Sequence, residues 1–172
     1  GKSALSVPQM NMVNEIGRRV MQGGSRRSAI YASLNWQHAD VKSFLKAKDW
    51  ADMPVADTGK SLWDIKQSDF NFPAPLDMTN ISVNYDTDWL LKYYDTGDPG
   101  DVFKENVKQA LKSAEPGFSF NFFDKENETL RNACTEVTSE DDSDVCNLGS
   151  LNFGRIGSIS ELKDVVRLAT MF

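Results

Sequence analysis

Histidine and cysteine are scarce in this sequence, with one His and two Cys among 172 residues. A structural zinc site takes four ligands, drawn mainly from cysteine and histidine, so this supply argues against one. Two cysteines are also too few for the disulfide framework of a secreted domain of this size. We therefore expect a cytoplasmic protein without a metal site.

Excess positive charge and long apolar runs are also lacking. The formal net charge is -6, whereas a general nucleic-acid or anionic-membrane binder needs a positive face. No apolar run approaches the roughly 20 residues of a membrane-spanning helix. We therefore expect no nucleic-acid partner and no membrane association.

The hydrophobic content of 40% over 172 residues predicts one domain with its own core. Apolar periodicity predicts helices over 7–22, 41–48, 87–93, 103–114 and 158–169, and strands over 30–36, 79–85 and 118–122. We expect a long surface loop over 50–76, and irregular chain around both cysteines. The alternation of helices and strands favours an α/β fold with largely parallel strands.

Both cysteines lie in the acidic stretch "RNACTEVTSEDDSDVCNL", residues 131–148. If this stretch is extended, Asn132, Cys134 and Glu136 face one way, because side chains alternate along a strand. An amide, a thiol and a carboxylate at one spot can hold, deprotonate and attack a hydroxylated substrate. A disulfide between Cys134 and Cys146, or a plain turn-rich surface loop, are the alternatives.

The stretch "QGGSRRS", residues 22–28, forms a second candidate site. Its glycines let the backbone approach a ligand, and its arginines, with Arg18 and Arg19 nearby, concentrate positive charge and predict a phosphorylated ligand. No Walker or dinucleotide fingerprint is present. The alternative is a helix C-terminus at which arginines complement the helix dipole.

Several motifs in order resemble one family. They are "QGGSRRSAIYASLNWQHADVKSFLKAK", "DMTNISVNYDTDWL", "PGFSFNFFDKEN", "NACTE" and "CNLGSLN". Together they resemble the catalytic large subunit of ribonucleotide reductase, which makes deoxyribonucleotides for DNA synthesis. The resemblance implies that residues 1–172 are a single partial domain from the ten-stranded α/β barrel of the ribonucleotide reductase and glycyl radical enzyme type. The specificity loop would span 21–28 and the active-site loop 131–148.

The resemblance also implies roles for the active-site loop. Cys134 would carry the thiyl radical that removes the 3′ hydrogen of the ribose, and Glu136 would take the 3′ hydroxyl proton. Asn132 would hydrogen-bond the substrate hydroxyls, and Cys146 would be one of two reducing thiols. An acidic run would disfavour the thiolate, as hydrogen-atom chemistry requires. The run comprises Glu140, Asp141, Asp142 and Asp144.

In the specificity loop, the resemblance assigns Gln22, Gly23, Gly24 and Arg26 to substrate and effector binding. Gln22 and Arg26 would sense the base and relay the identity of the effector. The implied partners are a ribonucleotide substrate, a nucleoside triphosphate effector and a thioredoxin-like reductant.

The subclass implied by the resemblance is the adenosylcobalamin-dependent class II, and the alternative is a radical supplied by a metal-containing partner subunit. The second reducing cysteine of the family, its first effector loop, its phosphate-binding loop and its C-terminal thiol pair are not found here. We therefore expect a fragment that is inactive without the missing parts or a partner chain. The other hypotheses are a non-catalytic nucleotide-binding or assembly module, and a homo-oligomer joined through unpaired strand edges.

Overall fold

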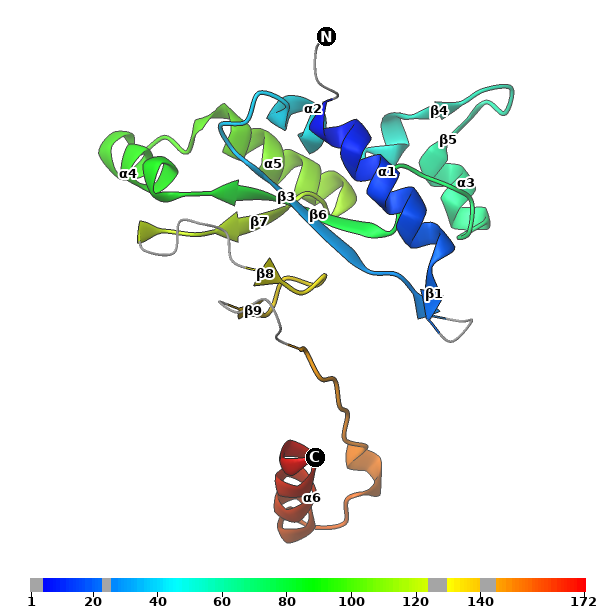
Figure 1. The fold of residues 1–172 in the computed structure, drawn as a ribbon, viewed down its shortest axis with the longest axis vertical. Helices are drawn as coiled ribbons and strands as arrows, with labels where there is room; N and C mark the ends of the chain where they lie inside the picture. Colours follow the sequence, from blue (N-terminus) through cyan, green and yellow to red (C-terminus); the bar gives the residue numbers. More distant parts are fainter. Residues whose placement is uncertain (1–4, 23–25, 124–129, 140–144) are drawn as a thin grey trace. The chain divides into compact units, whose positions relative to one another are not determined.

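The computed structural model describes residues 5–22, 26–123, 130–139 and 145–172 (Figure 1). The chain divides into two compact units, residues 1–140 and residues 141–172, and each is described by itself. Nothing in this division tests the predicted single partial barrel domain, which stays a prediction. Within the described ranges, no helix is both long enough and apolar enough to cross a membrane.

A three-stranded parallel sheet forms the centre of the first unit, in the order β3-β6-β7 (Figure 1). The strands are β3 (Ile30–Asn35), β6 (Thr79–Tyr85) and β7 (Gly117–Phe120). All three predicted strands and their parallel arrangement are confirmed. The sheet is open, because β3 and β7 each have one neighbour in it. The described residues therefore do not close the predicted barrel.

Four helices cover one face of this sheet (Figure 1). They are α1 (Ser6–Arg19), α2 (Val41–Leu45), α4 (Thr87–Thr96) and α5 (Gly100–Ser113). The buried core between sheet and helices includes Leu34, Val41, Phe44, Leu45, Ile81, Val83, Tyr85 and Trp89. In the strands, the apolar side chains of the predicted alternation are therefore the ones that point into this core.

Tyr85 lies at the centre of the core. Its ring centroid lies 5.0 Å from that of Trp89 and 5.3 Å from that of Phe103. Its hydroxyl donates to Asn106 Oδ1 at 2.9 Å, and Asn106 Nδ2 donates to the carbonyl of Pro116 at 2.7 Å. Burial raises the pKa of the Tyr85 phenol. The Tyr85 hydroxyl therefore has a hydrogen-bond partner within the protein, and the aromatic cluster packs around this buried polar pair.

The end of β6 leads directly into α4. Asp86 caps this helix, since its carboxylate accepts a hydrogen bond from the backbone N–H of Trp89 at 3.2 Å. The same carboxylate accepts from Asn35 Nδ2 at 2.7 Å and from Trp36 Nε1 at 2.9 Å. Asp86 therefore joins the ends of β3 and β6 to the start of α4.

The prediction of one long loop over residues 50–76 is wrong. This segment contains η1 (Trp50–Asp52), β4 (Pro54–Val55), β5 (Lys60–Ser61) and α3 (Leu62–Ser68). A capping box starts α3: Ser61 Oγ accepts from Asp64 N at 3.2 Å, and Asp64 Oδ2 accepts from Ser61 N at 3.0 Å. The helix was missed because only seven residues separate this cap from its end, too few to show a helical period.

The predicted end of the first helix at Gln22 is also wrong. The helix ends at Arg19, and Val20 is extended with φ -98° and ψ 107°. β1 (Met21–Gln22) then pairs antiparallel with β2 (Arg26–Arg27), which satisfies backbone groups that the helix no longer uses. Gly23 and Gly24, which follow the predicted end of this helix, lie outside the described residues.

The second unit contains η3 (Phe153–Arg155) and α6 (Ile159–Met171), after residues 145–150 without regular structure. The predicted N-terminus of the last helix is confirmed: Ser158 Oγ accepts from Glu161 N at 3.1 Å. The Glu161 carboxylate accepts from Gly157 N at 2.8 Å, one residue earlier than a standard capping box. Cys146 lies in the irregular stretch, as predicted, and is exposed.

Candidate functional site

Cys134 lies at the tip of a short hairpin rather than in irregular chain. β8 (Leu130–Arg131) pairs antiparallel with β9 (Thr138–Ser139), and residues 132–137 connect them. The turn is closed by Asn132, whose carbonyl accepts from Thr135 N at 3.0 Å and whose Oδ1 accepts from Val137 N at 3.2 Å. The Cys134 thiol at the tip is exposed.

This geometry corrects one step of the sequence argument. Only an extended chain over residues 132–137 would put Asn132, Cys134 and Glu136 on one side by alternation. The chain turns instead, and Thr135 has φ 70°, in the left-handed region. Alternation therefore says nothing about where these three side chains point, and the roles assigned to them stay predictions.

The face of the sheet opposite the helices is polar. By strand alternation and register it carries Tyr31, Ser33 and Asn35 from β3, Asn80, Ser82 and Asn84 from β6, and Ser119 and Asn121 from or just after β7. Asn121 Nδ2 donates to Asn84 Oδ1 at 2.5 Å and to Ser119 Oγ at 3.1 Å. A line of amides and hydroxyls thus runs across the sheet near the carboxyl ends of its strands, where open parallel sheets bind ligands.

The cysteine hairpin is fixed to this polar face by two hydrogen bonds. Asn80 Nδ2 donates to the carbonyl of Ala133 at 2.5 Å, directly before Cys134. Arg131 Nη2, on β8, donates to Asn121 Oδ1 at 2.9 Å. The thiol is therefore accessible to a substrate while the chain directly before it is held by the sheet, through the Ala133 carbonyl and the Arg131 side chain. Exposed reactive atoms on a fixed backbone are a general property of catalytic loops.

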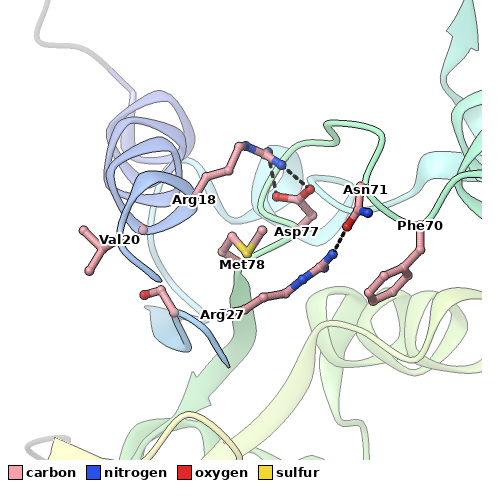
Figure 2. Close-up of a pocket in the computed structure, with 9 residues that line it drawn as sticks. Arg18, Val20, Arg27, Phe70, Asn71, Asp77 and Met78 are labelled. Atoms are coloured by element: carbon pink, nitrogen blue, oxygen red, sulfur yellow. Dashed lines mark hydrogen bonds and ion pairs between the residues drawn. The ribbon is translucent and has the colours of Figure 1, made fainter. Parts of the chain in front are cut away.

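The four arginines expected to concentrate positive charge do not all do so. Arg18 donates to both Asp77 oxygens at 2.7 Å (Figure 2). It also pairs with Glu15 at 3.0 Å. The guanidinium of Arg27 lies over the ring of Phe70, with Cζ 4.2 Å from the ring centroid, and donates to Asn71 (Figure 2). The guanidinium groups of Arg18 and Arg27 therefore both interact with other side chains of the protein.

A small cavity of about 200 Å³ lies beside these two arginines, between the end of α1, β2 and the segment before β6 (Figure 2). Ligand pockets usually span about 300–1,000 Å³, so the cavity is smaller than a nucleotide normally requires. Of the predicted loop residues, Gln22 and Arg26 are register partners in the β1-β2 pair, and Gly23 and Gly24 are not described. Their binding roles stay predictions.

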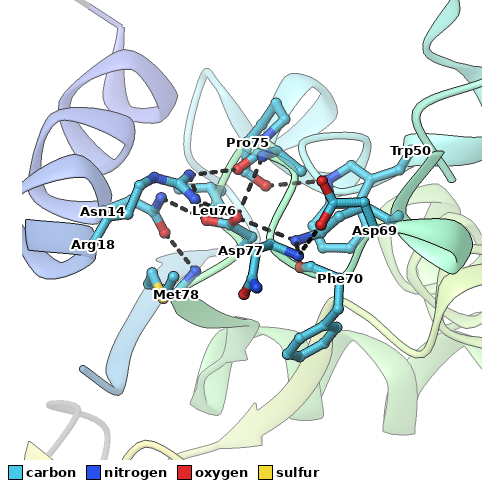
Figure 3. A network of polar contacts seen from close by, with 12 residues as sticks. Asn14, Arg18, Trp50, Asp69, Phe70, Pro75, Leu76, Asp77 and Met78 are labelled. Carbon is cyan, nitrogen blue, oxygen red and sulfur yellow. Dashed lines mark hydrogen bonds and ion pairs between the residues drawn. The ribbon is translucent and has the colours of Figure 1, made fainter. Parts of the chain in front are cut away.

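Asp77 organises a buried polar network that the sequence did not indicate (Figure 3). Its side chain is 2% exposed, and besides Arg18 it accepts from Asn14 Nδ2 at 3.1 Å, Lys66 Nζ at 3.4 Å and Ala74 N at 3.3 Å. Burial acts to raise the pKa of Asp77, but hydrogen bonds from Arg18 and Asn14 and the charge of Arg18 outweigh it and lower the pKa. The carboxylate is thus ionised and compensated.

Asn14 extends the network to the central strand (Figure 3). Its Oδ1 accepts from Met78 N at 2.8 Å and from Thr79 Oγ1 at 2.9 Å, and the residue is 1% exposed. The helix that leads into the predicted specificity loop is therefore attached to the start of β6, the strand that also holds the cysteine hairpin through Asn80.

A cofactor site cannot be assigned to the described side chains. No cluster of three or more His, Cys, Asp or Glu that could hold a metal ion occurs among them. His38 accepts from the backbone N–H of Asp40 through Nδ1 at 3.0 Å, within the turn before α2. The acidic run within residues 140–144, which we expect to disfavour the thiolate form of the active-site cysteine, lies outside the described residues.

Comparison with known proteins gives a family match for the N-terminal part of the chain. Residues 1–65 match the family model of the ribonucleotide reductase barrel domain. The match runs from α1 through β3 and α2 into α3, and so includes Gln22 and Arg26 but neither cysteine. No curated protein and no solved structure matches the chain. The family resemblance is thus supported over 65 of 172 residues, without a class.

Proposed function

We propose that the whole chain forms part of the catalytic barrel of a ribonucleotide reductase, and that Cys134 carries its thiyl radical. The observation that carries the proposal is the exposed Cys134 thiol on a hairpin whose backbone is hydrogen-bonded to the polar face of a parallel sheet. The family match over residues 1–65 and the parallel α/β architecture support the same assignment.

In this proposal the side chains act on the ribose of a bound ribonucleotide. The Cys134 thiyl takes the 3′ hydrogen atom and becomes a thiol, while Glu136 accepts the 3′ hydroxyl proton and Asn132 hydrogen-bonds the hydroxyls. The 2′ hydroxyl takes a proton from one of two thiols, one of them Cys146, and leaves as water. The thiol pair also supplies the two electrons and the hydrogen that is added at C2′, and it forms a disulfide. Cys134 then returns its hydrogen atom to C3′, which restores the thiyl, and Glu136 returns the proton to the 3′ oxygen. A thioredoxin-like dithiol then reduces that disulfide.

The cofactor, effector and partners are part of the proposal. Resemblance favours adenosylcobalamin as the radical source, with a metal-containing radical subunit as the alternative. A nucleoside triphosphate would act through Gln22, Gly23, Gly24 and Arg26. The second reducing thiol must come from another segment or chain, because the sequence holds only two cysteines.

The deciding experiment is ribonucleotide reduction by the complete reductase that contains this sequence. It is run with a dithiol reductant and, in parallel, with adenosylcobalamin or a metal-containing radical subunit. We expect Cys134→Ala to reduce turnover to background while nucleotide binding persists, because the radical has no carrier. Val137→Ala is the matched control: Val137 lies in the same turn, is 40% exposed and should keep most of the activity. Turnover by Cys134→Ala near the wild-type rate would refute the proposal.

A further inference from the structure

A groove of about 630 Å³ lies between α2 and α5, on the helical side of the sheet. Its apolar floor is formed by Leu45, which is 2% exposed, and by the partly buried Val102. Its volume lies within the range of ligand-binding clefts. The cysteine hairpin lies on the opposite face of the sheet, so the groove has no part in the proposed chemistry.

Four lysines line the groove in two pairs. Lys42 and Lys46 are four residues apart at α2, and Lys104 and Lys108 are four residues apart on α5. Like charges at this spacing on a helix repel and destabilise it. With Asp101 and Glu105 also in the lining, the groove carries four positive and two negative charges, a local +2 in a chain of net charge -6.

The two sides of the groove differ in how their lysines are compensated. On α5, Lys104 pairs with Asp98 at 2.8 Å and Lys108 with Glu105 at 3.7 Å. On the side of α2, Lys42 and the following Lys46 are exposed, and neither forms an ion pair with any described residue. The α2 side therefore presents two ammonium groups without a direct ion pair beside an apolar floor, and Lys46 also feels the more distant charge of Asp52.

We propose that this groove docks an acidic segment of a partner protein, whose carboxylates meet Lys42 and Lys46 and whose apolar side chain packs on Val102. Charge complementarity selects this partner. A long nucleic acid is a worse match, because it extends beyond the groove and the net charge of -6 repels a long polyanion. A short acidic peptide experiences mainly the local groove, since charges are screened beyond about 8 Å at physiological salt.

The test is fluorescence anisotropy of a labelled peptide of alternating Glu and Asp with a central Leu. The chain should bind it, and binding should weaken as salt is raised. The double variant Lys42→Glu with Lys46→Glu should weaken binding by about tenfold or more, the combined effect of two exposed ion pairs. The matched control is Lys60→Glu with Lys163→Glu, which makes the same charge change at exposed sites outside the groove and should bind within about twofold of wild type.

Three results would overturn the proposal. They are no binding by the wild-type chain, an equal loss in both double variants, or tighter binding of a DNA oligonucleotide of equal charge. A loss in the groove variant counts only if its circular dichroism and thermal midpoint match those of the control. Should that variant unfold, Lys42→Gln with Lys46→Gln repeats the measurement with a smaller charge change and should also weaken binding.

Discussion

Asp77 is the residue at which the first helix, the third helix and the central strand depend on one another. Its carboxylate compensates Arg18 and Lys66, whose side chains are 14% and 7% exposed. Removing one partner of a buried ion pair leaves an uncompensated charge and typically costs about 3–5 kcal/mol. The network is therefore a stabilising feature independent of any catalytic role.

We predict that Asp77→Asn lowers the free energy of unfolding by about 3 kcal/mol, measured by urea denaturation. Asparagine keeps the shape of the side chain but not its charge, so Lys66 loses its carboxylate partner and Arg18 keeps only the exposed carboxylate of Glu15. Asp95→Asn is the control: Asp95 is exposed on α4 and its replacement should change stability by less than about 0.5 kcal/mol. Equal losses in the two variants would contradict the role assigned to Asp77.

At this scale the residue types suggested roles that stay predictions, and they did not indicate how the chain is folded around them. Asn132, Cys134 and Glu136 were singled out by type and spacing, but the tight turn at Thr135 was not foreseen, because non-glycine residues seldom adopt positive φ. Asp77 was missed because its partner Arg18 lies 59 residues away. No local pattern reports such a contact.

Among the elements, α1 and β3 approach each other unusually closely at Gly17. A Cβ added there would lie 2.6 Å from Ile30 Cδ1 and 3.2 Å from Ser28 Oγ. Alanine is otherwise favoured over glycine inside a helix by roughly 1 kcal/mol. The glycine is thus explained by the contact, not by helix propensity.

We predict that Gly17→Ala is destabilising in the wild-type background and less so, or stabilising, when combined with Ile30→Val. Valine lacks the Cδ1 atom that the new methyl group meets, so it relieves an overpacking cost of typically 1–3 kcal/mol. A double-mutant cycle should give a favourable coupling of about 1 kcal/mol between the two changes. Strict additivity would show that the helix moves away without resistance.

The start of α3 offers a second test at the scale of elements. Ser61→Ala removes the hydroxyl of the capping box, and we expect a loss of about 1 kcal/mol in stability. Lys60→Ala, one residue earlier and exposed, is the control and should have a smaller effect. A loss for Ser61→Ala no larger than that control would show that the cap contributes little.

Periodicity predicted the elements that have one buried face. The strands around Leu34 and Val83, and the helix with Trp89, were found because their apolar residues repeat at the period of the element. Short elements were not found, since α3, β4 and β5 are too brief to show a period. The β8-β9 hairpin was missed for the same reason.

In the whole molecule, acid should weaken the fold. Burial acts to raise the pKa values of Asp77 and Asp86, but their hydrogen bonds, from Arg18 and Asn14 and from Asn35 and Trp36, lower both below the usual value. A carboxyl group whose pKa is lower in the folded than in the unfolded state stabilises the fold at pH values above its unfolded-state pKa of about 3.9. This stabilisation is lost as the pH falls through the folded-state pKa.

We therefore predict that the free energy of unfolding falls as pH drops below about 4, measured by urea titrations from neutral to acid pH. The Asp77→Asn variant should lose less stability over this range than the wild type, because it cannot take up the proton. If the variant and the wild type fall in parallel, Asp77 does not contribute to the acid sensitivity.

The alternation of strands and helices was enough to predict a parallel α/β unit, because a parallel connection needs a crossover such as a helix. Closure of the sheet is different. Closure requires further strands that pair with β3 and β7. The apolar pattern of residues such as Ile30 or Phe118 does not show how many strands the sheet contains.

The central strand β6 has two structural roles, one for each of its two faces. Its odd-numbered residues, 79–85, build the core, and its even-numbered residues, 80–84, build the polar face that holds the cysteine hairpin. Because the two sets alternate, adding or deleting a single residue would exchange them. In genetic terms, a change of length in this strand should be even less tolerated than a substitution, because one in-frame codon gained or lost there would displace core and site together.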